Sequence, residues 1–434
     1  MTLTAVVYDA AEIVTLESGE GGADGAGEDE GDDHERLGIY TDAAVAIEDG
    51  EIARVGPTGP VTREFPPENA AYAVDASGKT VIPGFVDPHT HALFAGDRAD
   101  EFEAKLRGKT YQEILAEGGG ILRTVRATRE ASDEQLLANL LDHLDAMLAH
   151  GTTTVEVKSG YGLDAETELR MLEVIDRADD RHPVDVVPTF MGAHAVPEGQ
   201  DAVERSSTSK RAKPVDADEY VDEVVEEQIP AVADQGIAEF CDVFCEEGVF
   251  SVEQSRRVLE AGKDAGMTPK VHAEELARIG GTRLAAEVGA ASADHLLHST
   301  EEDVEALVEN DVVPVLLPGT AFGLGADYAD ARTFLEAGAD VAIATDFNPN
   351  CYSQSMGFAA SLSCVEMGMT PAEALVAGTT NAAAALDLPE EVGTLQKGAP
   401  GDVAVLDAPT YVHVPYNFGV NTVDAVLKDG EVVY

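Results

Sequence analysis

Short apolar segments alternate with amphipathic segments through the middle of the chain. Helical periodicity favours helices over 134–150, 165–178, 252–265 and 301–309. The apolar runs, rich in Val and Ile, predict strands over 81–86, 152–157, 184–190, 240–244, 269–272, 291–295, 312–317 and 341–344. Eight strands alternating with helices favour a closed (β/α)8 TIM barrel. A doubly wound open sheet is the alternative, but no Gly-x-Gly-x-x-Gly pattern follows an early strand.

Both chain ends have a different pattern, with short strands and no helical periodicity. Strands are expected over 5–8, 12–16, 43–47 and 51–55, and again over 402–407, 425–428 and 431–434. Neither end has enough strands for a stable sheet of its own. We therefore expect one small β-sandwich domain built from residues 1–80 and 393–434, flanking a central barrel of residues 81–392.

Charge narrows the classes of function. The chain has 82 acidic against 28 basic residues and a formal net charge of -54. A surface so acidic argues against binding to nucleic acid or to an anionic membrane. The acidic stretch 17–36 is expected to be a loop without regular structure, and a cation or partner site is its functional alternative. The partner we expect is a small-molecule substrate.

The same acidity predicts adaptation to high internal salt, as in halophilic archaea. Like charges repel on a folded surface, and the repulsion falls as the screening length shrinks to about 3 Å near 1 M salt. We expect the melting temperature to rise from low to molar KCl, which thermal unfolding in a KCl series measures. A flat or falling melting temperature would contradict this prediction.

Cysteine content and hydropathy point to the cytoplasm. The four cysteines are Cys241, Cys245, Cys351 and Cys364. They lack the two paired sets of a zinc ribbon, so buried free thiols in a reducing compartment are expected. Residues 1–16 do not resemble a signal peptide, and no apolar stretch of about 18 residues predicts a membrane span.

Histidines at predicted strand ends suggest a metal site. His89 and His91 follow the first run, and alternate residues of an extended segment point the same way. His272, His295 and Asp346 end later runs. In a barrel these strand ends meet at one face, where catalytic residues lie. Imidazole and carboxylate ligands suit Zn²⁺ or Fe²⁺, and the sequence does not choose between them.

Other histidines lack that placement. His298 lies just past His295 and is a candidate for a supporting contact. We expect the remaining ones outside the strand ends to be structural or exposed: His34, His143, His150, His182 and His413.

Several motifs resemble a known family. The segment Pro83-Gly-Phe-Val-Asp-Pro-His-Thr-His91 resembles the first-strand signature of the amidohydrolase superfamily. Nearly the whole chain, apart from the stretches near 17–36 and 200–214, is similar to the imidazolonepropionase family. The segments that carry this likeness are 95–98, 158–162, 190–194, 271–275, 345–349 and 415–421.

The resemblance implies a hydrolase of histidine degradation that opens the cyclic amide of 4-imidazolone-5-propanoate to N-formimidoyl-L-glutamate. It implies one Zn²⁺ or Fe ion per subunit and a homodimer. The implied metal ligands are His89, His91, His272 and Asp346. The implied catalytic residues are Glu275, His295 and Asp346, and the implied substrate contacts are Arg98, Tyr161, His194, Glu275, Asn348, Asn350 and Cys351.

One departure from the family affects the substrate loop. The family usually has Gly and then Ser or Thr after Asn-Pro, whereas this chain has Asn350 and Cys351. Backbone contacts can persist there, but a hydroxyl contact is lost.

Three rival functions share parts of this pattern. A carboxylated Lys158 bridging two metals would indicate a dihydroorotase or hydantoinase, with about two metals per chain. A one-metal deaminase of guanine or cytosine would release ammonia. A metal-binding barrel without activity would leave all cyclic amides intact.

Overall fold

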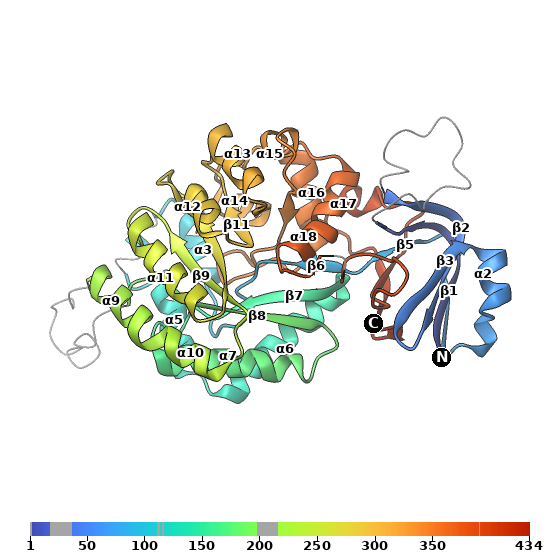
Figure 1. The fold of residues 1–434 in the computed structure, drawn as a ribbon, viewed down its shortest axis with the longest axis horizontal. Helices are drawn as coiled ribbons and strands as arrows, with labels where there is room; N and C mark the ends of the chain where they lie inside the picture. Colours follow the sequence, from blue (N-terminus) through green and yellow to red (C-terminus); the bar gives the residue numbers. More distant parts are fainter. Residues whose placement is uncertain (1, 18–36, 111–112, 115–116, 198–215, 390) are drawn as a thin grey trace.

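The computed structural model of the protein describes residues 2–17, 37–110, 113–114, 117–197, 216–389 and 391–434. Eight parallel strands form a near-closed barrel, and both chain ends form a separate mixed sheet beside it (Figure 1). The predicted TIM barrel with a small β-domain is therefore confirmed, while the domain limits at residues 80 and 392 stay predictions. Residues 18–36 and 200–214 lie outside the described residues.

The barrel strands follow one another in chain order. Each pairs in parallel with the next, from β6 to β13. The barrel closes where His91 N donates to Phe347 O at 2.9 Å and Asp346 N donates to His89 O at 3.1 Å. The strands are β6 (Phe85–Asp87), β7 (Thr152–Lys158), β8 (Asp185–Ala193), β9 (Phe240–Cys245), β10 (Thr268–Ala273), β11 (Ser292–His295), β12 (Val313–Leu316) and β13 (Ala342–Ile343).

The first apolar run differs from its prediction as a single strand. It is divided at Gly84 into β5 (Thr80–Pro83), which belongs to the small sheet, and β6, which belongs to the barrel. Gly84 N donates to Asp402 O at 3.0 Å, and a Cβ at this position would lie 2.8 Å from Thr153 Cβ. The chain passes from one sheet to the other at a point with no room for a side chain.

This close approach makes Gly84 a stability determinant. Gly84→Ala is expected to lower the free energy of unfolding by about 1–3 kcal/mol, because overpacking forces neighbouring atoms to move. Denaturant titration at constant KCl measures the change. Gly59→Ala is the matched control, since a Cβ there meets nothing within 4 Å. Equal denaturant concentrations at the unfolding midpoint of the two variants would refute the steric argument.

The small sheet joins strands from both chain ends. Its order is β16-β15-β14-β5-β1-β2-β3, and β4 pairs with β1 in parallel. The strands expected separately over 5–8 and 12–16 form one long strand, because Asp9 adopts a positive φ of 57° at a register shift and lets pairing continue. The remaining bounds are β1 (Leu3–Val14), β2 (Ile39–Glu48), β3 (Glu51–Pro57), β4 (Tyr72–Asp75), β14 (Val403–Leu406), β15 (Val423–Lys428) and β16 (Glu431–Val432).

Helices cover the outside of the barrel (Figure 1). Ser132, Asp164 and Ser251 cap three of them through side-chain oxygens that accept from backbone N–H groups. None of the described helices has both the length and the apolarity needed to cross a bilayer. The helices are α2 (Thr58–Glu64), α3 (Ala99–Leu106), α5 (Ile121–Glu130), α6 (Asp133–Ala149), α7 (Ala165–Asp179), α9 (Ala217–Glu223), α10 (Ile229–Gln235), α11 (Val252–Asp264), α12 (Gly281–Val288), α13 (Glu301–Glu309), α14 (Pro318–Leu324), α15 (Ala331–Glu336), α16 (Met356–Glu366), α17 (Pro371–Ala377), α18 (Thr380–Ala384) and α19 (His413–Tyr416).

Candidate active site

Three imidazoles and one carboxylate converge at the carboxyl ends of the barrel strands. His89 and His91 follow β6, His272 lies in β10, and Asp346 follows β13. Asp346 Oδ1 lies 3.7 Å from His89 Nε2 and 3.8 Å from His91 Nε2. His91 Nε2 lies 3.3 Å from His272 Nε2. The structure thus brings together the four residues expected to hold a metal.

The donor atoms of this cluster fit a divalent cation. His89 Nε2 is buried and has no hydrogen-bond partner among the described residues, which is costly for a polar atom unless an ion engages it. His89, His91 and Asp346 each offer a ligand atom within 4.8 Å of the others, as do His89, His272 and His295. Burial holds the pKa of His89 and of His91 well below its usual range, so both imidazoles are neutral, as ligands must be.

Two buried carboxylates orient these imidazoles. His89 Nδ1 lies 2.6 Å from Asp294 Oδ2, and His272 Nδ1 lies 3.1 Å from Asp242 Oδ1. A proton on each Nδ1 leaves the Nε2 lone pairs facing the cluster. Burial opposes a charge on His272, but Asp242 outweighs it and raises the pKa of this imidazole.

Lys158 is held as an ammonium group beneath the cluster. Its Nζ lies 2.7 Å from Glu156 Oε1 and 2.8 Å from Asp242 Oδ2, and all three side chains are fully buried. Burial opposes the charge, but Asp242 and then Glu156 outweigh it and raise the pKa of Lys158 above its usual range. Carboxylation requires a neutral amine, so this environment disfavours the two-metal rival.

Asp346 is positioned by Thr320 in α14 and by Asn348 in the loop after β13. The hydroxyl of Thr320 donates to Asp346 Oδ2, and Asn348 Nδ2 donates to Oδ1 at 3.0 Å. Asn348 Oδ1 accepts from the backbone of Asn350 at 2.7 Å and of Cys351 at 3.1 Å. Asn348 therefore fixes both the carboxylate and the loop after it.

His295 and Glu275 lie beside the cluster on the cavity side. His295 Nε2 lies 3.8 Å from Glu275 Oε2. Burial, and then the charge of Asp346, raises the pKa of Glu275 to about 8. His295 and Asp346 have positive φ values of 78° and 47°. Such strain, worth about 1–3 kcal/mol per residue, clusters at functional sites.

A cavity of about 560 Å³ opens above the cluster. Arg98, Tyr161 and His194 line it, as do Glu275, Asn348 and Asn350. Arg98 Nε donates to Glu101 at 2.8 Å, and its terminal nitrogens donate to no described residue. His194 Nδ1 donates to Gly160 O at 3.0 Å, and its ring stacks on His91 at a centroid distance of 4.7 Å.

Two expected residues lie away from this cavity. Cys351 is buried and its Sγ lies 3.5 Å from Thr345 O, so the loop turns its side chain from the expected substrate contact. His298 is exposed in the turn after β11 and does not line the cavity. The four cysteines are free; Cys241, Cys245 and Cys351 are buried as predicted, whereas Cys364 is only partly buried, contrary to the prediction. His34 lies outside the described residues.

Sequence reasoning missed the residues that support the ligands. Asp242 and Lys270 are charged residues between apolar neighbours in their strands, and that contrast was the signal that could have identified them, whereas Asp294 lies in the polar strand Ser292–His295 and lacks it. Thr320 follows β12 in α14 and carries no comparable signal, because its role depends on where β13 ends.

An eight-stranded parallel barrel with buried histidines and an aspartate at its carboxyl face defines a metal-dependent hydrolase class. The profile of the Amidohydrolase family matches residues 80–433. The imidazolonepropionase of Haloarcula marismortui is 68% identical over 432 residues, covering 100% of this chain and 96% of the relative. The imidazolonepropionase of Geobacillus kaustophilus is 49% identical, covering 92% of this chain and 91% of the relative.

Solved structures agree with the fold. An adenosine deaminase from Xanthomonas campestris with bound zinc has a TM-score of 0.71 at 18% identity, covering 99% of this chain and 93% of that one. Atrazine chlorohydrolase from Arthrobacter aurescens, complexed with zinc, has a TM-score of 0.68 at 15% identity, covering 99% of this chain and 95% of that one. The chain belongs to the amidohydrolase family and, within it, to the imidazolonepropionases.

Proposed function

We propose that this protein hydrolyses the cyclic amide of 4-imidazolone-5-propanoate to N-formimidoyl-L-glutamate in histidine degradation. The observation that carries the proposal is the meeting, in one cavity, of a His and Asp cluster with Arg98, whose terminal nitrogens have no partner among the described residues. The cluster suits amide hydrolysis, and guanidinium matches carboxylate geometry. Full-length identity to imidazolonepropionases supports the same reaction.

A single Zn²⁺ or Fe ion per subunit would be held by His89, His91, His272 and Asp346. When bound, it would lower the pKa of a water from about 15.7 towards about 7 and polarise the scissile carbonyl. The buried Nε2 of His89 and the ammonium form of Lys158 support one ion rather than two.

The chain's own side chains then carry the reaction. Asp346 accepts a proton from the attacking water and passes it to the ring nitrogen as the carbon–nitrogen bond breaks. His295 polarises the carbonyl and stabilises the oxyanion. Glu275 hydrogen-bonds a ring N–H.

Binding of the propanoate tail uses the far side of the cavity. Arg98 grips the carboxylate, with Tyr161 and His194 completing the site. Asn350 lines the rim and Asn348 acts through Asp346, whereas the burial of Cys351 argues against a substrate contact there.

Incubation with the proposed substrate tests the function. Metal-replete protein in molar KCl should consume 4-imidazolone-5-propanoate, with loss of ring absorbance and appearance of N-formimidoyl-L-glutamate. An inert substrate would refute the proposal. Ring opening of dihydroorotate or hydantoin with two metals per chain would favour the first rival, and ammonia release from guanine or cytosine the second.

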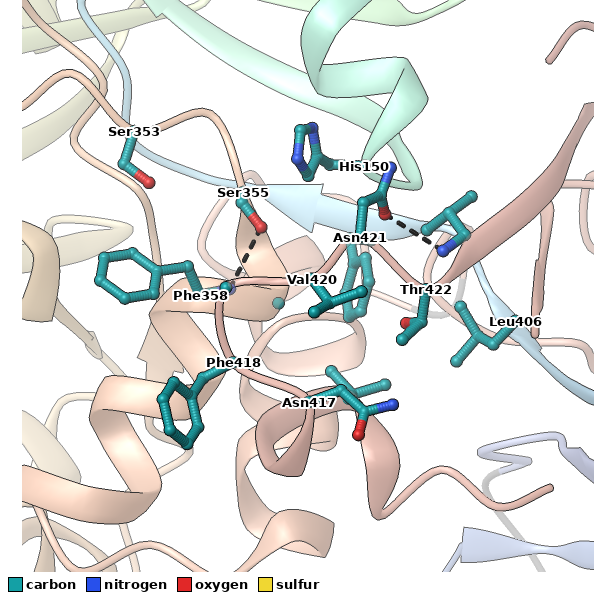
Figure 2. Close-up of a pocket in the computed structure, with 15 residues that line it drawn as sticks. His150, Ser353, Ser355, Phe358, Leu406, Asn417, Phe418, Val420, Asn421 and Thr422 are labelled. Atoms are coloured by element: carbon teal, nitrogen blue, oxygen red, sulfur yellow. Dashed lines mark hydrogen bonds between the residues drawn. The ribbon is translucent and has the colours of Figure 1, made fainter. Parts of the chain in front are cut away.

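We also propose a homodimer in the cytoplasm, where the buried thiols stay reduced. Tyr416, Phe418 and Val420 are 73%, 70% and 69% exposed, and apolar residues gathered on a surface mark an interface. Figure 2 shows Phe418 and Val420 around a second cavity of about 260 Å³, which lies apart from the His cluster. Light scattering should give twice the chain mass, and Phe418→Ser should give a monomer; a monomeric native protein would contradict this.

A further inference from the structure

Helix α3 turns a charged face towards the catalytic cavity. Arg98 precedes the helix, and Glu101 and Lys105 lie three and seven positions further on, so all three share one helical face. All three line the cavity. An inward face of a helix is ordinarily apolar, so a face of two cations and one carboxylate calls for a polar ligand.

The one carboxylate of this face is already engaged by other groups. Glu101 accepts from Arg98 Nε at 2.8 Å and from Gly120 N at 3.0 Å. Arg123 Nη1 lies 3.6 Å from the same carboxylate. Glu101 forms no ion pair with Lys105, and its charge opposes the lowering of the pKa of this lysine without reversing it.

Lys105 forms no ion pair with a described residue, although acidic residues outnumber basic ones 82 to 28. Its Nζ instead donates to Asn350 Oδ1 at 2.8 Å, which spans the cavity mouth from α3 to the loop after β13. Asn350 is one of the two residues, with Cys351, that depart from the usual pattern of the family. The neutral amide holds the ammonium in place and brings no negative charge to it.

The guanidinium of Arg98 and the ammonium group of Lys105 thus lie near each other at the partly buried entrance of the cavity. Burial, and then the charge of Arg98, lowers the pKa of Lys105. Like charges brought close in a partly buried site cost free energy unless an anion lies between them. The arrangement is suited to receive a carboxylate, since two of the three donors of the ammonium group remain besides the one given to Asn350.

We propose that Lys105, anchored by Asn350, is a second cationic contact for the carboxylate tail of the substrate and sets the specificity of this cavity for anions. This inference rests on the proposed function. Arg98 provides the bidentate contact, and Lys105 provides a point charge from the same face of α3.

Steady-state kinetics of Lys105→Gln test the inference. The glutamine can still donate to Asn350 but carries no charge. We expect KM for 4-imidazolone-5-propanoate to rise about tenfold with kcat within twofold, as for one lost charge-assisted hydrogen bond. KM for the methyl ester of the substrate should not change, and Lys105→Arg should restore most of the affinity for the acid.

Arg107→Gln is the matched control. It removes the same charge two residues away, from a side chain that is 76% exposed and paired with Glu103 at 2.6 Å outside the cavity. An unchanged KM in Lys105→Gln, or an equal rise for the ester, would overturn the inference. Absence of turnover in the unmodified protein would instead refute the proposed function, so the two failures are distinguishable.

Discussion

Glu275→Gln is expected to lower kcat by about 10²–10⁴-fold while folding and metal content persist. The two side chains have the same shape, but only the carboxyl group can accept a hydrogen bond through both oxygens or exchange a proton. Its position 3.8 Å from His295 Nε2 places it beside the proposed ring-binding region. Steady-state rates, metal analysis and circular dichroism give the three measurements.

The control for this variant is Glu247→Gln, because Glu247 is exposed just beyond β9 and does not line the cavity. It makes the same chemical change without touching the site, so its kcat should equal that of the unmodified protein. Retained turnover in Glu275→Gln would remove Glu275 from the mechanism.

Asp346→Asn is expected to reduce both metal content and turnover. The substitution removes the only carboxylate among the four proposed ligands and the proposed proton acceptor. Metal-ion polarisation and water activation are worth several kcal/mol, so turnover should fall by about three orders of magnitude. Plasma mass spectrometry gives the metal per chain, and kinetics give the loss of rate.

Chelation of the unmodified protein should abolish activity, and separate addition of Zn²⁺ or Fe²⁺ should show which ion restores it. Asp340→Asn is the control, since Asp340 is exposed at the opposite end of β13. Full activity in Asp346→Asn, or in the protein freed of metal, would refute the metal-dependent mechanism.

The strand-end positions were predictable because their determinants are local. Alternation along an extended segment puts His89 and His91 on one side, and the parallel order expected from strand-helix alternation puts His272 and Asp346 at the same face. The helix over Glu301–Glu309 was predicted with its observed bounds, since Thr300 and Asp303 form a capping box there.

Other features depend on contacts between distant segments. The first apolar run is divided at Gly84 because Thr153 and Asp402 approach it closely. Thr153 is more than sixty positions away in the sequence, and Asp402 is more than three hundred positions away. Cys351 turns away from the cavity because Asn348 fixes its loop on Asp346. Neither contact has a periodic pattern in the sequence.

The sequence by itself determined the barrel, the small domain from both ends, and the residues offered to a metal, because hydrophobic period and strand direction are short-range properties. Only the tertiary structure decided which carboxylates orient which imidazoles, that two buried carboxylates surround Lys158, and that Lys105 bonds to the amide of Asn350 and to no carboxylate of the described residues. The reason is that burial and pairing of a charge depend on closure of the barrel, which joins residues far apart in the chain.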